Sequence, residues 1–312
     1  MSAEHIIPGL DDPTCGIAVA AKQLIARGVG EDGEVWVHSM WTPIVISAGI
    51  KALLTGKKLI CMPHGCTDPT KLKFHWHKKR WVAPIERWLF RRADRIIATC
   101  DEELAWIKAF EPKVKKVEVI ELSQPKLENI SGLFPQSGAT RSACASCIKL
   151  LYVGRLHKLK GVNYLLDAIA KLPNPQSVEL RIIGKDEGEG KSLKKQADRL
   201  NLNTTFEGVV SEDAKNAAYE WCDALVLPTL SENFGLVVAE ALECGKRVIT
   251  TDGAPAWGDG LTGLTGFPGL YSGYDGRLIY LKGYRDGTDE ERVELLRRAI
   301  ELMSIGEKMA VS

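Results

Sequence analysis

The chain has 312 residues, of which 45% are hydrophobic and 26% charged, and its formal net charge at pH 7 is only +1. This length suggests about two domains with ample core, and the near-neutral charge gives no global electrostatic case for nucleic acid binding. No stretch approaches the ~18 apolar residues of a membrane span, and acidic residues interrupt 1–16, where a signal peptide needs an apolar core. We therefore expect a cytoplasmic protein.

The first half of the chain alternates apolar segments with helical patterns, separated by short polar stretches. The predicted strands are 35–40, 58–64, 95–100 and 117–122, with helical periods such as 42–56 and 101–110 between them. Residues 125–147 are rich in Ser, Gly and Pro and lack either period, so we interpret them as a linker. The first domain is therefore predicted to span 1–124.

Residues 71–95, "KLKFHWHKKRWVAPIERWLFRRADR", combine basic and aromatic side chains. We favour a first-domain helix whose aromatic side packs on the sheet while its charges are solvated, because amphipathic helices usually bury their apolar face in a core. The alternative is a helix at an anionic membrane surface, which would make the protein peripheral at the inner membrane and its acceptor lipid-linked. His75 and His77 are two positions apart, which does not place both rings on one helical face, so we predict no metal there.

The eight cysteines do not predict a metal or redox centre. Cys61, Cys100, Cys222 and Cys244 lie in or beside apolar runs and are interpreted as small buried hydrophobic residues. Cys144 and Cys147 have C-x-x-C spacing, which supplies only half of a zinc site, and we find no second half.

A second series of strands follows the linker, and we assign 148–312 to a second domain. Its predicted strands are 148–156, 177–185, 204–210, 223–230 and 246–251, with helical patterns at 161–172, 190–200, 211–221 and 235–244. Alternation of this kind predicts parallel sheets with helices on both faces. Ligands of such sheets bind at the carboxyl ends of the strands, and each candidate site follows a strand.

The segment "YVGRLHKLKGV", 152–162, ends a strand and opens a helix. Gly154 permits close backbone approach, and Arg155 and Lys160 bring two cations to a loop near a helix N-terminus, where a diphosphate would be stabilised. An ordinary basic loop is the alternative. The Walker pattern G-x-x-x-x-G-K-[ST] is absent, which argues against a P-loop kinase or ATPase.

Two glutamates in 227–245, "LPTLSENFGLVVAEALECG", are eight positions apart. Glu232 lies just before the N-terminus of the helix predicted for 235–244, whereas Glu240 lies within this helix, which is otherwise almost wholly apolar. A carboxylate is costly to bury unless it is paired or hydrogen-bonded. Two ribose hydroxyls would satisfy Glu240; the alternative is a salt bridge to Lys246 or Arg247.

The stretches "GRLHKLKG", "ELRIIGKDEGEG" and "SENFGLVVAEALECGKRVITTDGAP" resemble those of retaining, sugar-nucleotide-dependent glycosyltransferases of family four, and the match covers nearly the whole second domain. The resemblance implies an α/β fold of two Rossmann-like domains facing across a cleft (GT-B), with the terminal helix packing back on the first domain. It implies that Arg155 and Lys160 hold the donor diphosphate, that Glu240 binds the ribose and that Glu232 contacts the transferred sugar. The backbone N–H groups of Asn233, Phe234 and Gly235 would hold the sugar hydroxyls or the phosphate, and the base would rest near Gly184 and Val209.

The first domain carries two further motifs of this resemblance. "MPHGCTDP", 62–69, resembles the family's His-Gly corner, which implies that His64 reaches the donor sugar beside its anomeric carbon. "DPTCGIAVAAKQL", 12–24, resembles the glycine-rich loop before the first helix, so Gly16 is predicted to lie at the diphosphate, although the family usually has a second glycine where this chain has Cys15. The short interval before 35–40 indicates that one or more strand–helix units are missing, so we predict a shortened first domain.

The resemblance implies transfer of a hexose from a nucleoside diphosphate sugar, UDP-sugar being favoured, to an acceptor hydroxyl with retention of anomeric configuration. The acceptor would be a glycan or a lipid-linked molecule, and the pathway lipopolysaccharide or other surface glycan assembly. No Asp-x-Asp metal motif is evident, and two cations make a metal unnecessary, so we predict no metal and no cofactor. A sugar-nucleotide epimerase, a phosphorylase and a non-catalytic donor-binding scaffold are the alternatives.

Overall fold

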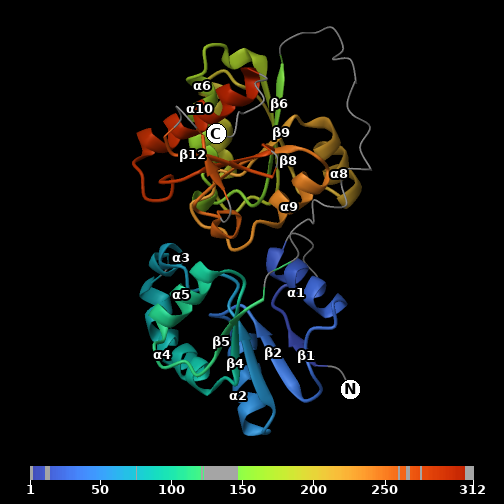
Figure 1. The fold of residues 1–312 in the computed structure, drawn as a ribbon, viewed down its shortest axis with the longest axis vertical. Helices are drawn as coiled ribbons and strands as arrows, with labels where there is room; N and C mark the ends of the chain where they lie inside the picture. Colours follow the sequence, from blue (N-terminus) through green and yellow to red (C-terminus); the bar gives the residue numbers. More distant parts are fainter. Residues whose placement is uncertain are drawn as a thin grey trace. The chain divides into compact units, whose positions relative to one another are not determined.

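The computed structural model describes residues 3–10, 15–74, 76–120, 122, 147–258, 261–264, 268–274 and 276–305. The chain divides into two compact units, Met1–Ser123 and Gln124–Ser312 (Figure 1). Each unit alternates strands and helices around a sheet that is largely or wholly parallel, which confirms the predicted α/β fold class. The predicted linker lies outside the described residues, apart from the exposed Cys147.

The first unit is built on a five-stranded parallel sheet with the order β1-β2-β3-β4-β5. Its strands are β1 Glu4–Ile6, β2 Glu34–His38, β3 Lys58–Met62, β4 Arg95–Ala98 and β5 Val117–Val119. Its helices are α1 Gly16–Ala26, α2 Pro43–Leu54, α3 Pro69–Lys73, α4 Trp76–Arg92 and α5 Asp101–Phe110. The sequence patterns predicted β2 to β5 but not the edge strand β1.

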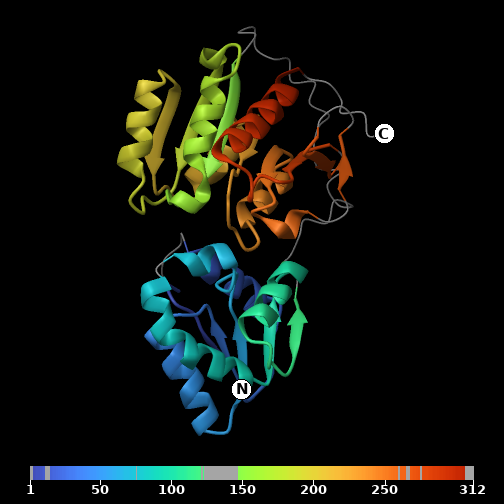
Figure 2. The same ribbon diagram turned by 90° about the vertical axis from the view of Figure 1, so that its left-hand side faces the viewer.

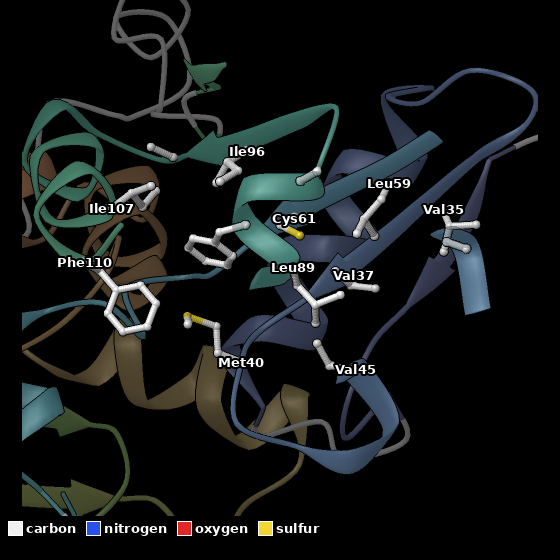
Figure 3. Packing of buried hydrophobic residues seen from close by; sticks show 14 of the residues in the cluster. Val35, Val37, Met40, Val45, Leu59, Cys61, Leu89, Ile96, Ile107 and Phe110 are labelled. Carbon is white, nitrogen blue, oxygen red and sulfur yellow. The ribbon is translucent and has the colours of Figure 1, made fainter. Parts of the chain in front are cut away.

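One face of this sheet carries the main hydrophobic core of the unit. Side chains alternate between the two faces of a strand, and Val35, Val37, Leu59, Cys61 and Ile96 all point to the same face. Residues of α2, α4 and α5 pack against them (Figure 3). Those helical residues are Val45, Ala52, Ala83, Leu89, Phe90, Ile107 and Phe110.

The opposite face of the sheet carries Trp36, His38, Ile60 and Met62, which are all buried. Helix α1 belongs to a separate small cluster, in which Ala18 and Ala21 pack with Ile7 just after β1. The two faces of the sheet are therefore chemically different, because only this second face includes polar aromatic rings.

Helix α4 does not pack its tryptophans on the sheet, so the interpretation favoured from sequence is wrong on this point. Ala83, Leu89 and Phe90 form the inner face of the helix. Trp81 is 73% exposed and Trp88 38% exposed. The aromatic side chains of this segment divide between the core and the solvent.

The second unit contains an eight-stranded sheet with the order β11-β12-β13-β10-β9-β6-β7-β8. Its strands are β6 Ile148–Val153, β7 Val178–Ile183, β8 Asn203–Gly208, β9 Ala224–Val226, β10 Arg247–Thr251, β11 Thr262–Gly263, β12 Leu270–Gly273 and β13 Leu278–Leu281. Its helices are α6 Val162–Ala170, α7 Gly190–Arg199, α8 Glu212–Trp221, α9 Leu236–Glu243 and α10 Asp289–Ile305. Pairing is parallel from β13 through β8, and β12 is antiparallel to β11 and β13.

The last helix, α10, packs beside α6, and both views show the two helices next to each other (Figure 2). Arg292 ties this pair to the loop after β13, because its guanidinium donates to the carbonyls of Tyr284 and Arg285 at 3.0 and 2.9 Å. The expected contact of the terminal helix with the first domain stays a prediction. Within its own unit, α10 contacts α6 and β13.

Candidate active site

The predicted donor-binding residues of the second unit lie in loops that follow neighbouring parallel strands. Arg155 and Lys160 follow β6, Gly184 follows β7, Val209 follows β8 and Glu232 follows β9. Because the carboxyl ends of parallel strands meet at one edge of a sheet, the order β9-β6-β7-β8 brings these loops to the same edge. The chain also turns in opposite directions from β6, to β7 on one side and to β9 on the other, which is where open α/β sheets bind ligands.

Arg155 is held by a carboxylate that the sequence patterns did not single out. Its Nη1 lies 3.0 Å from both carboxylate oxygens of Glu187, in the loop after β7. The two side chains remain 50% and 30% exposed. No described residue bonds the other guanidinium nitrogens, so Arg155 keeps donors for a second anion.

Lys160 is 5% exposed, and its ammonium group forms an ion pair with Glu232. It also lies 3.5 Å from the carbonyl oxygen of Ser231. A buried ammonium requires such partners, because desolvation of an unpaired charge costs several kcal/mol. The pair joins Lys160, which was predicted to bind the donor diphosphate, to Glu232, which was predicted to contact the transferred sugar.

Glycines allow the loops of this edge to approach one another closely. Gly161 has φ +66°, and a Cβ there would lie 2.1 Å from the carbonyl oxygen of Pro228. At Gly184, φ is +145°, and a Cβ would lie 1.9 Å from the carbonyl oxygen of Gly154. A larger residue at Gly161 would separate the loops that carry Lys160 and Glu232, and one at Gly184 would separate the loops that follow β6 and β7.

The Asn-Phe-Gly stretch forms the entry to α9. Asn233 and Phe234 are 8% and 3% exposed, and the ring of Trp257 packs on Phe234 and donates a hydrogen bond to its carbonyl. Gly235 caps the helix at φ +71°. The N–H of Asn233 already donates to Glu232 at 3.0 Å, so the predicted sugar contact of this group requires that bond to be exchanged.

Glu240 on α9 is paired, but not with the residues that the salt-bridge alternative named. Its Oε2 accepts a hydrogen bond from Tyr219 at 2.8 Å and lies 3.1 Å from the ammonium of Lys215. Lys246 and Arg247 instead donate to backbone carbonyls. No described residue bonds Oε1, and the side chain is 31% exposed, so one carboxylate oxygen remains available to a ligand.

The two predicted base-binding residues differ in kind. Gly184 contacts backbone, and its N–H donates to the carbonyl of Gly208 at 2.7 Å. Val209 is a large hydrophobic residue that is 54% exposed. An apolar side chain at the end of β8 suits the face of a base, whereas Gly184 permits the close approach of the Gly154 carbonyl.

In the first unit, His64 is 4% exposed and adopts φ +53° in the turn after β3. The carboxylate of Glu103 fixes this turn, because it accepts a hydrogen bond from the N–H of Gly65 and from the N–H and hydroxyl of Thr99 at 2.8 and 2.7 Å. The His-Gly corner is therefore held by a buried carboxyl group whose pKa is raised by burial. Gly16 begins α1, and a Cβ at this position would meet open space; the loop residues 11–14 before it lie outside the described residues.

Sequence reasoning missed Glu187, Lys215 and Tyr219. Lys215 and Tyr219 are four positions apart on α8 and therefore share one face of that helix. This spacing was visible, but nothing in the pattern linked that face to Glu240. Glu187 lies in a run of acidic and glycine residues, and nothing in that run predicted that Glu187 pairs with Arg155.

Within the described ranges, no three His, Cys, Asp or Glu side chains are grouped as metal ligands would be. Cys144 lies outside those ranges, so the C-x-x-C pair is described at only one end. The prediction that activity needs no metal is untested.

Fold and site together define a protein with the architecture of GT-B glycosyltransferases. The model of "Glycosyl transferases group 1" matches residues 147–258, and that of "Glycosyltransferase Family 4" matches residues 5–122. The chain belongs to this glycosyltransferase family. A curated relative, the D-inositol 3-phosphate glycosyltransferase of Mycobacterium ulcerans, is 35% identical over 133 residues, which are 40% of this chain and 27% of the relative.

Solved structures share the fold at low sequence identity. WaaG, a glycosyltransferase involved in lipopolysaccharide biosynthesis, superposes with a TM-score of 0.66 at 16% identity, over 96% of this chain and 90% of WaaG. Anabaena Alr3699/HepE in complex with UDP-glucose gives a TM-score of 0.59 at 22% identity, over 94% of this chain and 74% of HepE. These likenesses confirm the predicted two-domain GT-B fold.

Proposed function

We propose that the chain is a retaining glycosyltransferase that moves a hexose from a nucleoside diphosphate sugar to an acceptor hydroxyl. The observation that carries this proposal is the set of charged groups at the carboxyl edge of the second sheet. Arg155 and Lys160 supply two cations there, and Glu232 and Glu240 supply two carboxylates. A nucleotide sugar presents the complementary groups, namely a diphosphate and hydroxyls on two sugar rings.

In the proposed complex the diphosphate binds Arg155 and Lys160, and the free Oε1 of Glu240 accepts hydrogen bonds from the ribose hydroxyls. Glu232 and the backbone of Asn233 to Gly235 contact the transferred sugar, and the base lies on Val209 beside Gly184. From the family resemblance, His64 is still predicted to contact the donor sugar and Gly16 to lie at the diphosphate.

Bond cleavage leaves positive charge on an oxocarbenium-like sugar and negative charge on the departing diphosphate. Arg155 and Lys160 are positioned before the reaction, so they stabilise the developing negative charge without reorganising solvent. The sugar then bonds the acceptor oxygen on the face from which the diphosphate leaves, and a diphosphate oxygen takes the acceptor's proton. This route needs no protein nucleophile and no metal, and it is inferred from the family.

UDP-sugar is the favoured donor, supported by the UDP-glucose that HepE binds. A role in lipopolysaccharide or other surface glycan assembly is supported by the work of WaaG in that pathway. Both properties belong to proteins of low identity, so they enter as proposals for this chain.

The test is slow hydrolysis of UDP-sugars without acceptor, compared between the wild type and Glu232→Gln. We expect release of UDP that the substitution abolishes; with an acceptor, NMR of the new linkage should show the donor's anomeric configuration. Binding of UDP without any turnover would support a non-catalytic donor-binding scaffold instead. This is the main alternative to the transferase, because the first unit is small and has only five strands among its described residues. Recovery of an epimerised donor would indicate the epimerase.

The acceptor is proposed to be lipid-linked, and α4 to contact an anionic membrane surface. Trp81, Ile85 and Trp88 recur at i, i+4 and i+7, so they share one face of α4, and they are 73%, 42% and 38% exposed. Arg80 stacks over Trp81 at 5.2 Å and Arg92 over Trp88 at 5.7 Å. Tryptophan beside arginine on an exposed helical face suits the interface of an anionic bilayer. No helix among the described residues is long and apolar enough to cross a membrane.

Vesicle sedimentation tests this contact with phosphatidylglycerol and with phosphatidylcholine vesicles. We expect binding to the anionic vesicles only, reduced about tenfold by the double substitution Trp81→Ser and Trp88→Ser, because each removes apolar area from the interface. Leu54→Ser is the matched control, since Leu54 is 82% exposed on α2. Equal binding of the double variant and the wild type would contradict the proposal.

A further inference from the structure

Three histidines form a continuous hydrogen-bonded row on the second face of the first unit's sheet. Nδ1 of His5 lies 3.0 Å from Nε2 of His38, and Nδ1 of His38 lies 2.9 Å from Nε2 of His64. The rings are nearly parallel, with interplanar angles of 24° and 27°. His5 is in β1, His38 ends β2 and His64 follows β3, so the row runs diagonally toward the carboxyl edge of the sheet.

The central ring determines how the row can be protonated. His38 is fully buried and uses both nitrogens, and a neutral imidazole has one N–H and one acceptor nitrogen. Its two hydrogen bonds must therefore point in the same direction along the row. Burial, with the neighbouring His64 and His5, lowers the pKa of His38 to about 2, and burial with the charge of Lys71 lowers that of His64 to about 3. Both rings are neutral at neutral pH.

The outer end of the row selects one of the two directions. The other nitrogen of His5, Nε2, faces the turn at Val29 and Gly30, where it lies 3.4 Å from the position of a Cβ on Gly30. The backbone of Val29 hydrogen-bonds this ring, and together with the charge of Glu34 it opposes the lowering of the His5 pKa by burial. Because this backbone bond raises the pKa of His5, we infer that the ring donates it to the Val29 carbonyl, and Nε2 is the nitrogen on that side. Nε2 of His5 then carries the hydrogen, and Nδ1 accepts from His38.

We propose that His5 and His38 are positioning residues that hold His64 in the tautomer with hydrogen on Nε2 and a lone pair on Nδ1. In this arrangement Nε2–H of His64 donates to Nδ1 of His38, and Nε2–H of His38 donates to Nδ1 of His5. The result is a neutral acceptor at the His-Gly corner, whose turn Glu103 fixes. Only the use of this acceptor, to receive a hydrogen bond from a hydroxyl of the donor sugar, rests on the proposed function.

The tautomer can be read in the free protein by NMR of ¹⁵N-labelled histidine. We expect the couplings between ring nitrogens and ring hydrogens to assign His38 and His64 as neutral Nε2–H rings that do not titrate between about pH 5.5 and 8. Hydrogen on Nδ1 of His64, a charged ring or an equal mixture of tautomers in the wild type would overturn the proposal. This experiment needs no variant and no substrate, so it is decisive even if the transferase assay fails.

Variants then test whether the row transmits the preference. His5→Phe removes the outer partner and keeps an aromatic ring, and we expect the tautomers of His38 and His64 to become mixed. His38→Gln is the second variant, and His77→Gln is the matched control because His77 is exposed on α4. Unchanged His64 resonances in folded His5→Phe and His38→Gln, with circular dichroism as the check of folding, would show that the row is only structural.

Discussion

The two units of the chain differ in the polar groups that they place at the ends of their strands. In the second unit, cations meet carboxylates at the strand ends, as in the pairs Arg155–Glu187 and Lys160–Glu232. In the first unit, burial dominates behind the His-Gly corner: it lowers the pKa of His38 to about 2 and that of His64 to about 3, so both rings are neutral, and it raises the pKa of Glu103.

This difference separates two ways of preparing a site. Paired charges can exchange one partner for an anionic ligand, because the ligand replaces the interaction that the carboxylate gave. Neutral hydrogen-bonded groups have little to exchange, and they fix geometry instead. We therefore expect charge substitutions in the second unit to change ligand binding, and those in the first unit to change stability and its dependence on pH.

The largest effect is expected at Lys160. Lys160→Met removes a cation proposed to bind the diphosphate and leaves Glu232 without its ion-pair partner, so UDP should bind roughly 100-fold more weakly. Calorimetric titration measures this change. Lys158→Met is the matched control, because Lys158 is exposed in the same short helical turn; an equal loss there would mean that only general positive charge matters.

The next effect concerns Glu86, a buried carboxyl group of α4 that accepts a hydrogen bond from the N–H of Trp41 at 2.6 Å. Burial raises its pKa to about 7, against that hydrogen bond, which lowers it. The folded state then binds the Glu86 proton more tightly than the unfolded state does. Protonation of Glu86 therefore stabilises the fold; this contribution is complete below about pH 4.5 and is lost as the pH rises to about 7.

In Glu86→Gln this pH dependence should disappear. The difference between the free energies of unfolding at about pH 5 and pH 8 should shrink by roughly 2 kcal/mol, measured by urea denaturation at both values. Glu102→Gln on the exposed side of α5 is the control. An undiminished pH dependence in Glu86→Gln would show that Glu86 ionises freely in the folded chain.

The smallest effect is expected at Glu187. This carboxylate competes with a diphosphate for Arg155, and partly exposed pairs contribute about 1 kcal/mol or less. Glu187→Gln should therefore bind UDP about two- to fivefold more tightly, and this gain should vanish in an Arg155→Ala background. Glu189→Gln controls for the loss of one negative charge in the same loop. Weaker binding by Glu187→Gln would mean that Glu187 orients Arg155 rather than competing for it.

Much of the fold could be predicted because period and turn chemistry are local properties. Strands such as 58–64 and 95–100 and the helix 101–110 were predicted within a few residues, since buried parallel strands form apolar runs between polar turns. The strands β1, β11, β12 and β13 were not predicted; β1 is an edge strand, and β11 to β13 form the end of the second sheet that contains its antiparallel pairs.

The candidate site was predictable where one short motif carried both position and chemistry, as for Arg155, Lys160, Glu232 and Glu240. Its partners were not, because Glu187, Lys215 and the His5–His38–His64 row are brought together by strand order and register. The prediction that the aromatic side of α4 packs on the sheet was wrong for a related reason. Composition shows that a helix has aromatic residues, but tertiary packing decides which of them, here Phe90, reach the core.

The central claim is that the second unit binds a nucleoside diphosphate through Glu240, and calorimetric titration of UDP, GDP and ADP tests it most directly. We predict saturable binding of one of them, with UDP favoured, to the wild type and to Glu243→Ala, which alters an exposed residue of the same helix. Glu240→Ala should lose that binding, because the ribose hydroxyls lose their acceptor. Absence of binding by all three nucleotides to the wild type, or full binding by Glu240→Ala, would contradict the account.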